Sequence, residues 1–368
     1  MARRLPRWGR TVRMVGRGQE DDARTGGSAM ESALVTGGCG FIGRHLTALL
    51  AQRGYRVRVL DLQDWPEAPR GVDVQIGSIL DPEALRCALD GVDLVFHLAA
   101  NPNLWAPDPR TFHAVNYEGT LRVLDAAQAA GVARIVYTST ESILKNIRAR
   151  NGERAALIDE SVELAIEDVW GAYCRSKFLA EGAARQAARS GLPVVIVNPT
   201  MPVGPGDGLL TPPTRMLLGF LNGATPAYLD CEFNLVDARD VALGHLLAAE
   251  RGRVGERYIL GGENQQLGHV LDLLRELTGL PIARWRVPYA FAYVAGLISE
   301  SLSLFTKHPP VAPLTGVVLA RTSMAFDCRK ARRELGWVSR PLRQSLFDAV
   351  LDLQSRGLLR RNLRPQLA

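Results

Sequence analysis

Residues 33–43 read ALVTGGCGFIG, and the glycine spacing in this stretch decides the fold. Its apolar start predicts a short strand, and Gly38, Gly40 and Gly43 complete a G-x-G-x-x-G pattern ahead of an expected helix. Counted from Gly37, the loop also reads G-x-x-G-x-x-G. Glycines let the backbone turn tightly and approach a pyrophosphate, whose charge is stabilised at a helix N-terminus. This context predicts a dinucleotide-binding loop, and a tight β–α turn without a ligand is the alternative.

Further β-branched runs follow the first one, and segments of helical periodicity separate them. These runs are residues 55–61, 72–77, 92–100, 133–140 and 192–199. Alternating strands and helices predict βαβ units with parallel strands and right-handed crossovers. The expected fold class is therefore α/β, a Rossmann-like doubly wound parallel sheet with a smaller C-terminal substrate-binding domain.

The length of 368 residues agrees with about two domains. Apolar residues make up 47% and charged residues 22%, which excludes a largely disordered chain, a collagen-like fibre and a disulfide scaffold. The expected units are a disordered basic tail (1–29), a dinucleotide-binding Rossmann domain (30–199) and a mainly substrate-binding domain (200–368). Residues 234–262 are expected to return to the Rossmann domain.

Charge and cysteine usage exclude several classes of partner. The net charge is +6, but seven Arg and three acidic residues put +4 of it in residues 1–30. The remainder is nearly balanced, so nucleic acid is not an expected partner; a basic arm touching anionic lipid or nucleic acid is the alternative for the tail. The five cysteines form no C-x-x-C pair and the histidines show no ligand spacing. We therefore expect a reducing, cytoplasmic location, no disulfide and no metal.

The most hydrophobic run is PYAFAYVAGLISESLSLF, residues 288–305. It is marginal for spanning a bilayer, and it contains Glu300 and three serines. A buried or pocket-lining helix is the expected structure. A membrane-facing patch that admits a lipid-like substrate, and so a peripheral membrane contact, is the alternative.

Asp61 ends the run VRVLD, about 20 residues after the glycine loop. A carboxylate at this place accepts hydrogen bonds from the adenosine ribose hydroxyls and repels a 2′-phosphate. The expected cofactor is therefore NAD, with NADP disfavoured. An acidic residue that only caps a loop is the alternative.

Tyr173 and Lys177 lie four residues apart in an expected helix, DVWGAYCRSKFLAEGAARQ, and so share one face. A phenol with a pKa near 10 is a poor acid–base group at neutral pH. A neighbouring ammonium and a positive nicotinamide ring would both lower that pKa. Ser139 and Thr140 end the preceding strand, where a hydroxyl could hydrogen-bond the substrate oxygen.

Five motifs carry a family resemblance: TGGCGFIG (36–43), HLAA (97–100), AVNYEGT with Asn116, YTST (137–140) and YCRSK (173–177). The chain resembles the extended short-chain dehydrogenases/reductases, the NAD-dependent epimerase/dehydratase superfamily, over residues 32–358. Longer stretches resemble hopanoid-associated sugar epimerases, which are similar to dihydroflavonol reductases and 3β-hydroxysteroid dehydrogenases. These stretches are 103–109, 171–181, 191–207 and 234–264.

The resemblance implies a role for each matching residue. Tyr173 would be the catalytic acid/base, and Lys177 would lower its pKa and hold the ribose. Thr140, with Ser139 before it, would supply the catalytic hydroxyl, and Asn116 would be structural or part of a proton relay. The cofactor-binding set is Gly37, Gly38, Gly40, Phe41, Ile42, Gly43, Asp61, Leu98, Ala99, Ala100, Tyr173, Lys177, Asn198 and Pro199.

Three departures from the family pattern concern the binding of the cofactor and the type of reaction. Gly77-Ser78 replaces a Gly-Asp pair whose Asp touches adenine in many relatives. Close relatives often have Arg where this chain has Asp61, which again favours NAD. Dehydratases carry Thr-Asp-Glu where this chain has Thr140-Glu141-Ser142, so β-elimination is not expected.

The predicted function is epimerisation of a sugar or nucleotide-sugar hydroxyl through a transient ketone, by an enzyme that keeps its cofactor. An NAD(P)-dependent dehydrogenase or ketoreductase of a steroid-, flavonoid- or hopanoid-like alcohol is the alternative. A non-catalytic dinucleotide sensor is a third hypothesis, although such proteins usually lose the Tyr or the Lys. The family resemblance also implies a homodimer that forms through the helices near 110–130 and 167–190.

Overall fold

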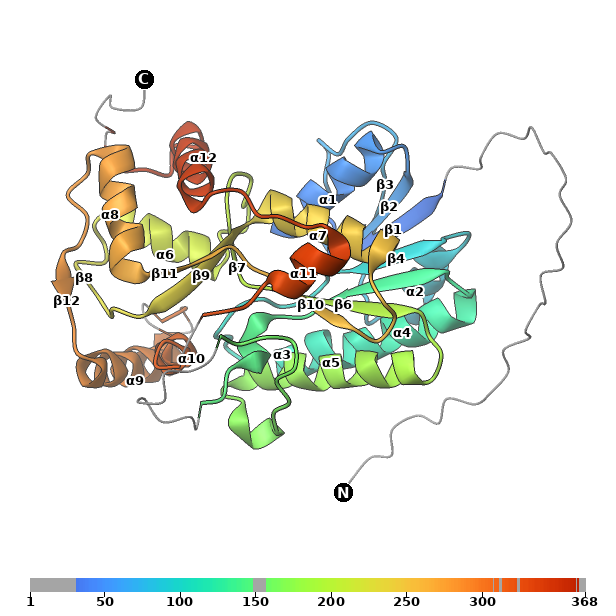
Figure 1. Ribbon diagram of the computed structural model, residues 1–368, viewed down its shortest axis with the longest axis horizontal. Coiled ribbons are helices and arrows are strands. Elements are labelled where there is room, and N and C mark those ends of the chain that lie inside the picture. The colour runs from blue at the N-terminus through green and yellow to red at the C-terminus, as the bar shows by residue number, and fades with distance from the viewer. Residues whose placement is uncertain are drawn as a thin grey trace, which may run out of the picture.

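A seven-stranded parallel sheet forms the centre of the larger lobe (Figure 1). The computed structural model describes residues 31–147, 157–306, 308–310, 313–322, 325–361 and 363, so the tail predicted at 1–29 lies outside the described residues. In spatial order the strands are β10 (Arg257–Leu260), β6 (Val194–Pro199), β5 (Arg134–Thr138), β4 (Leu94–His97), β1 (Ser32–Thr36), β2 (Arg56–Asp61) and β3 (Asp73–Ile76). The chain runs outward from β1 to β3, then from β4 to β6 on the other side. This confirms the doubly wound sheet and predicts a ligand crevice at the carboxyl ends of β1 and β4.

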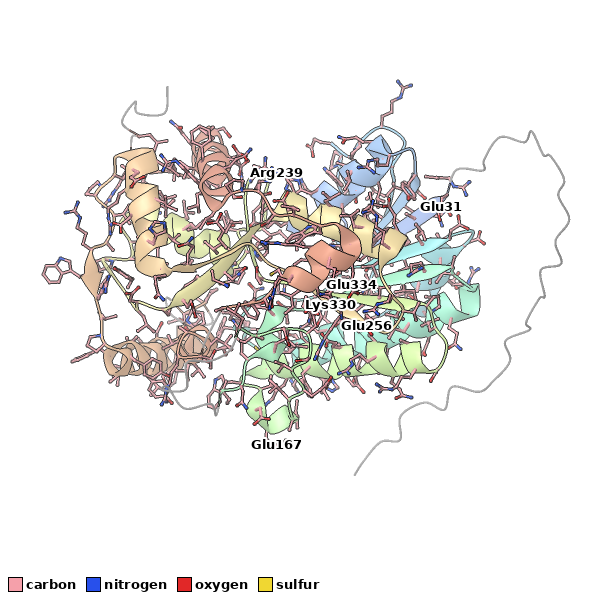
Figure 2. The ribbon with its side chains drawn as sticks, in the orientation of Figure 1. Glu31, Glu167, Arg239, Glu256, Lys330 and Glu334 are labelled. Atoms are coloured by element: carbon pink, nitrogen blue, oxygen red, sulfur yellow. The ribbon has the colours of Figure 1, made fainter. Side chains whose placement is uncertain are left out.

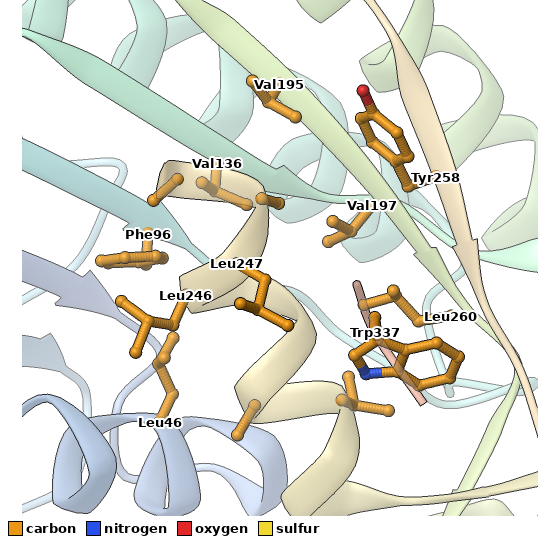
Figure 3. Close-up of a cluster of buried hydrophobic side chains, with 14 of the residues drawn as sticks. Leu46, Phe96, Val136, Val195, Val197, Leu246, Leu247, Tyr258, Leu260 and Trp337 are labelled. Atoms are coloured by element: carbon orange, nitrogen blue, oxygen red, sulfur yellow. The ribbon is translucent and has the colours of Figure 1, made fainter. Parts of the chain in front are cut away.

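Helices cover both faces of this sheet. They are α1 (Phe41–Gln52) and α7 (Ala238–Arg251) on one face, and α2 (Pro82–Leu89), α4 (Gly119–Ala130) and α5 (Ala172–Arg189) on the other. Successive side chains of a strand point to opposite faces. Val195 and Val197 therefore join the core under α7 (Figure 3), while Val194 and Ile196 join the core under α5. Because both of its faces are covered, β6 is buried along its whole length, whereas the edge strand β3 has no buried residue.

Salt bridges connect the C-terminal part of the chain to this core (Figure 2). Lys330, in α11 (Arg329–Leu335), donates to Glu256 at 2.6 Å beside the edge strand β10. Arg239, in the first turn of α7, pairs with Asp348 at 2.6 Å. Asp348 belongs to α12 (Leu342–Ser355), so this pair joins the two lobes.

The smaller lobe contains two short sheets and its own apolar core. Its elements are β7 (Met201–Val203), α6 (Pro212–Leu221), β8 (Ala227–Tyr228), β9 (Glu232–Asp237), β11 (Glu263–Gln266), α8 (Leu267–Thr278), β12 (Trp285–Arg286), α9 (Tyr289–Thr306), α10 (Leu314–Leu319) and α12. Within residues 234–262, α7 and β10 lie on the large sheet, whereas β9 pairs with β7 and β11. The division into two domains stays a prediction.

The run at 288–305 forms helix α9, but the expectation that this helix is buried was wrong. Phe291 is 71% exposed and Phe305 is 86% exposed, and the apolar residues between them on the same face are also exposed. Burial instead falls on the small and polar residues of the helix, such as Gly296 and Ser303. None of the helices in the described part of the chain is long and apolar enough to cross a membrane.

Candidate functional site

The glycine loop lies at the switch point of the sheet, between β1 and β4. Gly37 has a φ of 73°, and a Cβ there would lie 2.7 Å from the backbone nitrogen of Ala99. A Cβ on Gly43 would lie 2.2 Å from the carbonyl oxygen of Gly37. Only glycine fits either position, because the neighbouring atoms belong to the backbone. The loop therefore keeps the close backbone packing that a pyrophosphate site requires.

Helix α1 starts directly behind this loop. Its N-cap is Gly40, and no side chain caps the first turn, which begins with Phe41 and Ile42. The first N–H groups of a helix have no partner within the helix and favour an anion. On the other side, Leu98 donates its N–H to the carbonyl oxygen of Thr36, which brings the segment of Ala99 and Ala100 beside the loop. This arrangement fits the pyrophosphate of NAD.

Asp61 ends β2 and faces the same loop. One carboxylate oxygen accepts a 2.9 Å hydrogen bond from the backbone N–H of Cys39, and the other accepts one of 3.1 Å from Gln63. The carboxylate is thus fixed where an adenosine ribose would lie in a protein of this fold. Burial raises the pKa of the Cys39 thiol to about 11, so this cysteine acts as a packing residue rather than a nucleophile.

Tyr173 lies in the first turn of α5. Gly171 precedes the helix with a φ of 86°, and this turn directs the chain from the preceding loop into α5. The ring of Phe112 packs edge-on against Tyr173, with centroids 6.2 Å apart. Burial raises the pKa of the Tyr173 phenol, whereas the nearby Thr140 side chain acts in the opposite direction. The structure thus brings Tyr173 and Thr140 together.

Lys177 lies one turn after Tyr173 and is buried. Its ammonium donates a 2.6 Å hydrogen bond to the carbonyl oxygen of Thr138 and lies 4.7 Å from the centre of the Tyr137 ring. Burial lowers the pKa of Lys177 to about 7, and the charge of Glu181 acts against this shift. The expected effect of Lys177 on the pKa of Tyr173 stays a prediction.

Asn116 lies in a π-helical turn, His113–Glu118, that sequence periodicity did not predict. Its Oδ1 accepts a 2.7 Å hydrogen bond from the backbone N–H of Asn101, and its Nδ2 donates to the Oγ of Ser176 at 3.0 Å. These bonds connect the loop after β4 to helix α5. They match the structural role for Asn116, and the proton-relay role stays a prediction.

Asn198 and Ser139 end neighbouring strands of the large sheet. Asn198 donates from Nδ2 to the carbonyl oxygen of Thr140 at 3.1 Å and to Glu181 at 2.7 Å. In the described part of the chain, the Asn198 Oδ1 and the Ser139 Oγ are buried and have no hydrogen-bond partner. Pro199, also buried, follows Asn198. Two unpartnered polar atoms beside Thr140 fit a site that completes its hydrogen bonds with a cofactor or substrate.

Two buried ion pairs support these residues, and the sequence analysis missed both. Glu141 accepts a 2.8 Å hydrogen bond from the Thr140 hydroxyl and pairs with Lys145 at 3.1 Å. Glu181, which holds Asn198, pairs with Arg257 at 3.0 Å. Glu141 and Lys145 are four residues apart, a spacing that could have indicated the first pair.

Comparison with known proteins identifies the family. The sequence profile of the "NAD dependent epimerase/dehydratase family" matches residues 33–261. The chain belongs to this family. A Synechocystis protein, provisionally named a dihydroflavonol 4-reductase, is 38% identical over 89% of this chain and 95% of its own length. Sterol demethylase protein B of Methylococcus capsulatus is 32% identical over 89% of this chain and 100% of its own length.

Solved structures agree with this assignment. PA4631, a nucleoside-diphosphate-sugar epimerase from Pseudomonas aeruginosa, superposes with a TM-score of 0.71 at 25% identity, over 90% of this chain and 100% of that protein. The chain described here is therefore an NAD-dependent enzyme of the extended short-chain dehydrogenase/reductase type. The substrates of this family are small molecules.

Proposed function

We propose that the enzyme interconverts a secondary alcohol and a ketone on an apolar, polycyclic or otherwise lipid-like molecule. The observation that carries the proposal is the position of Tyr173, in the first turn of α5 and beside the Thr140 side chain, at the edge of the sheet that holds the glycine loop. A phenol and a hydroxyl side by side can hold one substrate oxygen and exchange its proton.

The roles of the residues follow from this geometry. Bound NAD would supply the hydride acceptor beside the substrate carbon. Tyr173 takes the hydroxyl proton during oxidation and returns it during reduction. Thr140 holds the same oxygen, and Lys177 would hold the cofactor ribose. Asn198, fixed by Glu181, keeps the backbone of Thr140 in place.

The apolar substrate is supported by two observations. The relatives at 38% and 32% identity are named for a flavonoid alcohol and for sterols, whereas the nucleoside-diphosphate-sugar epimerase is 25% identical. Helix α9 has exposed apolar side chains and contacts α10. Helix α10 in turn packs on the loop before Tyr173, since a Cβ on Gly171 would lie 2.8 Å from Thr315. An apolar surface is thus connected to the candidate site through α10.

Epimerisation of a sugar or nucleotide-sugar hydroxyl is the second candidate, because the same residues can transfer hydride out and back. Asp61 favours it, since an NAD enzyme that recycles its cofactor needs no reductant. The two candidates differ in what happens to the cofactor.

The nucleotide that leaves the purified protein on denaturation tests the two candidates. We expect less than one NAD per protein, reversible binding of added NAD, and formation of NADH with a 3β-hydroxysteroid as the probe alcohol. Tightly held, stoichiometric NAD with turnover of UDP-glucose and no net NADH would support the epimerase instead. Mass detection after chromatography distinguishes NAD from NADP, and recovery of NADP would contradict the proposed role of Asp61.

Replacement of Asp61 should change cofactor choice. We expect Asp61→Ala to weaken NAD binding by about 10–100-fold, because hydrogen bonds to a charged group contribute about 1.5–3 kcal/mol. Asp61→Asn keeps an acceptor for Cys39 but loses the charge that repels a 2′-phosphate, so its preference for NAD over NADP should fall. Dissociation constants from protein fluorescence measure both effects. The matched control is Asp90→Asn on the surface; equal losses there would refute a role for Asp61.

A homodimer and a cytoplasmic location also stay proposals. The outer side of α5 carries a hollow lined by Pro109, His113, Ile166, Ala172, Arg175, Ser176 and Leu179. His113 and the four residues from 172 to 179 fall within the ranges 110–130 and 167–190 that the family resemblance suggests for a dimer. Light scattering on the purified chain measures the mass directly.

A further inference from the structure

Helix α9 has an amphipathic pattern that is inverted relative to an ordinary surface helix. An ordinary surface helix buries its apolar stripe and exposes its polar residues. In α9 the exposed stripe is apolar: Phe291 (71% exposed), Val294 (52%), Ile298 (57%), Leu302 (58%) and Phe305 (86%). Their spacing of three or four residues puts them on one face, along about 20 Å of helix.

Two polar residues of α9, Glu300 and Ser303, lie on the side of the helix that faces the protein, whereas Ser301 is exposed. Glu300 accepts a 3.0 Å hydrogen bond from the backbone N–H of Leu314, at the start of α10. The hydroxyl of Ser303 is buried and donates to the carbonyl oxygen of Ser299 at 2.9 Å. The hydrogen bond from Leu314 and the burial of Ser303 place this side of the helix against the protein, so the apolar stripe faces outward.

Basic and aromatic side chains surround the N-terminal end of α9. Trp285, in the strand just before the helix, is 79% exposed, with exposed Arg284 and Arg286 on either side. Arg321 lies over the ring of Tyr289 at 5.5 Å. Asp230 pairs with Arg286 at 3.1 Å and offsets its charge, so the positive charge at this end of the helix comes mainly from the exposed Arg284 and Arg321.

Apolar residues on one helix face, with Trp and Arg at its end, are typical of a helix that lies in a lipid interface. The Arg residues complement the negative surface of an anionic bilayer. We propose that α9 docks this enzyme on an anionic lipid bilayer, with the stripe from Phe291 to Phe305 inserted among the acyl chains. Helix α9 lies at the edge of the smaller lobe (Figure 1), where a flat surface can reach it.

The docking face lies close to the catalytic residues. Helix α10 contacts α9 on one side, and on the other it packs on Gly171 and Leu104. Gly171 is two residues before Tyr173, and Leu104 lies in the loop after β4. A bilayer-bound enzyme would therefore present the mouth of its site beside the membrane. The docking itself does not depend on the proposed substrate.

Vesicle binding tests the proposal on the full chain. We expect co-sedimentation with vesicles of phosphatidylcholine containing about one quarter phosphatidylglycerol, and weaker binding to phosphatidylcholine alone. The triple variant Phe291→Ser/Ile298→Ser/Phe305→Ser should lose binding by at least about tenfold, because three apolar side chains no longer leave water. The matched control Val254→Ser/Val338→Ser/Leu351→Ser removes exposed apolar residues elsewhere and should bind as the wild type does.

Fluorescence separates insertion from simple adsorption. Trp285 should shift to shorter wavelength on vesicle addition, and the shift should be absent in Trp285→Phe and reduced in the triple variant. Binding that the triple variant retains in full would overturn the proposal, since another basic segment would then hold the lipid. Absence of binding by the wild type would overturn it too. If the wild type binds no lipid and the triple variant has a lower mass in light scattering, the stripe is instead an interface with a second copy of the chain.

Discussion

Tyr173→Phe should lower the turnover number by about 10²–10⁴-fold while leaving the dissociation constant of NAD nearly unchanged. The substitution removes only the phenolic oxygen, and a phenylalanine ring keeps the edge-on contact with Phe112. Formation of NADH with a 3β-hydroxysteroid and with UDP-glucose measures the first effect. Tyr55→Phe, a tyrosine packed under α1 and α7, is the matched control. Unchanged turnover in Tyr173→Phe would favour the non-catalytic dinucleotide sensor.

The pH dependence of oxidation tests how Tyr173 is activated. In the proposed mechanism the phenolate of Tyr173 is the base, so the oxidation rate should rise with pH until Tyr173 is fully ionised. Since the Thr140 side chain acts against the rise that burial causes in the pKa of this phenol, Thr140→Ala should move the rise in rate to higher pH. Thr140→Ser keeps the hydroxyl and should restore the wild-type profile. A lower rate without any shift in pH would mean that Thr140 only holds the substrate.

Local patterns were sufficient to predict the parts of the fold that depend on neighbouring residues. The glycine loop follows β1 as expected, since its spacing requires a tight turn at Gly37. Tyr173 and Lys177 share a helix because four residues make about one turn. Helix α9 was predicted as a helix but not its exposed face, because most residues from 288 to 305 are apolar and the sequence alone does not show which side of such a helix faces solvent.

Long-range contacts could not be predicted from the same patterns. Arg257 and Glu181 are separated by 76 residues, and only the pairing of β10 with β6 brings them together. The π-helical turn around Asn116 inserts an extra residue into a periodic helix, and composition alone does not reveal it. The residues that position the site were therefore harder to predict than those proposed to react.

Lys145→Met should lower the free energy of unfolding by about 3–5 kcal/mol. The variant leaves the carboxylate of Glu141 buried without its cation, and the side chain of Lys145 is only 2% exposed. Urea denaturation followed by fluorescence measures the loss. Arg343→Met breaks an exposed pair with Glu276, 56% and 61% exposed, and should cost less than about 1 kcal/mol. Similar losses in both variants would contradict the argument from burial.

The double variant Glu141→Gln/Lys145→Met separates stability from chemistry. Removing both charges leaves no unpaired ion, so most of the lost stability should return. The Thr140 hydroxyl, however, loses the carboxylate to which it donates its proton at 2.8 Å. If the pair positions Thr140, the double variant should stay folded and bind NAD, yet show a lower turnover number and a shifted pH profile. Wild-type turnover in a stable double variant would mean that the pair contributes to folding alone, because Thr140 would then need no fixed partner.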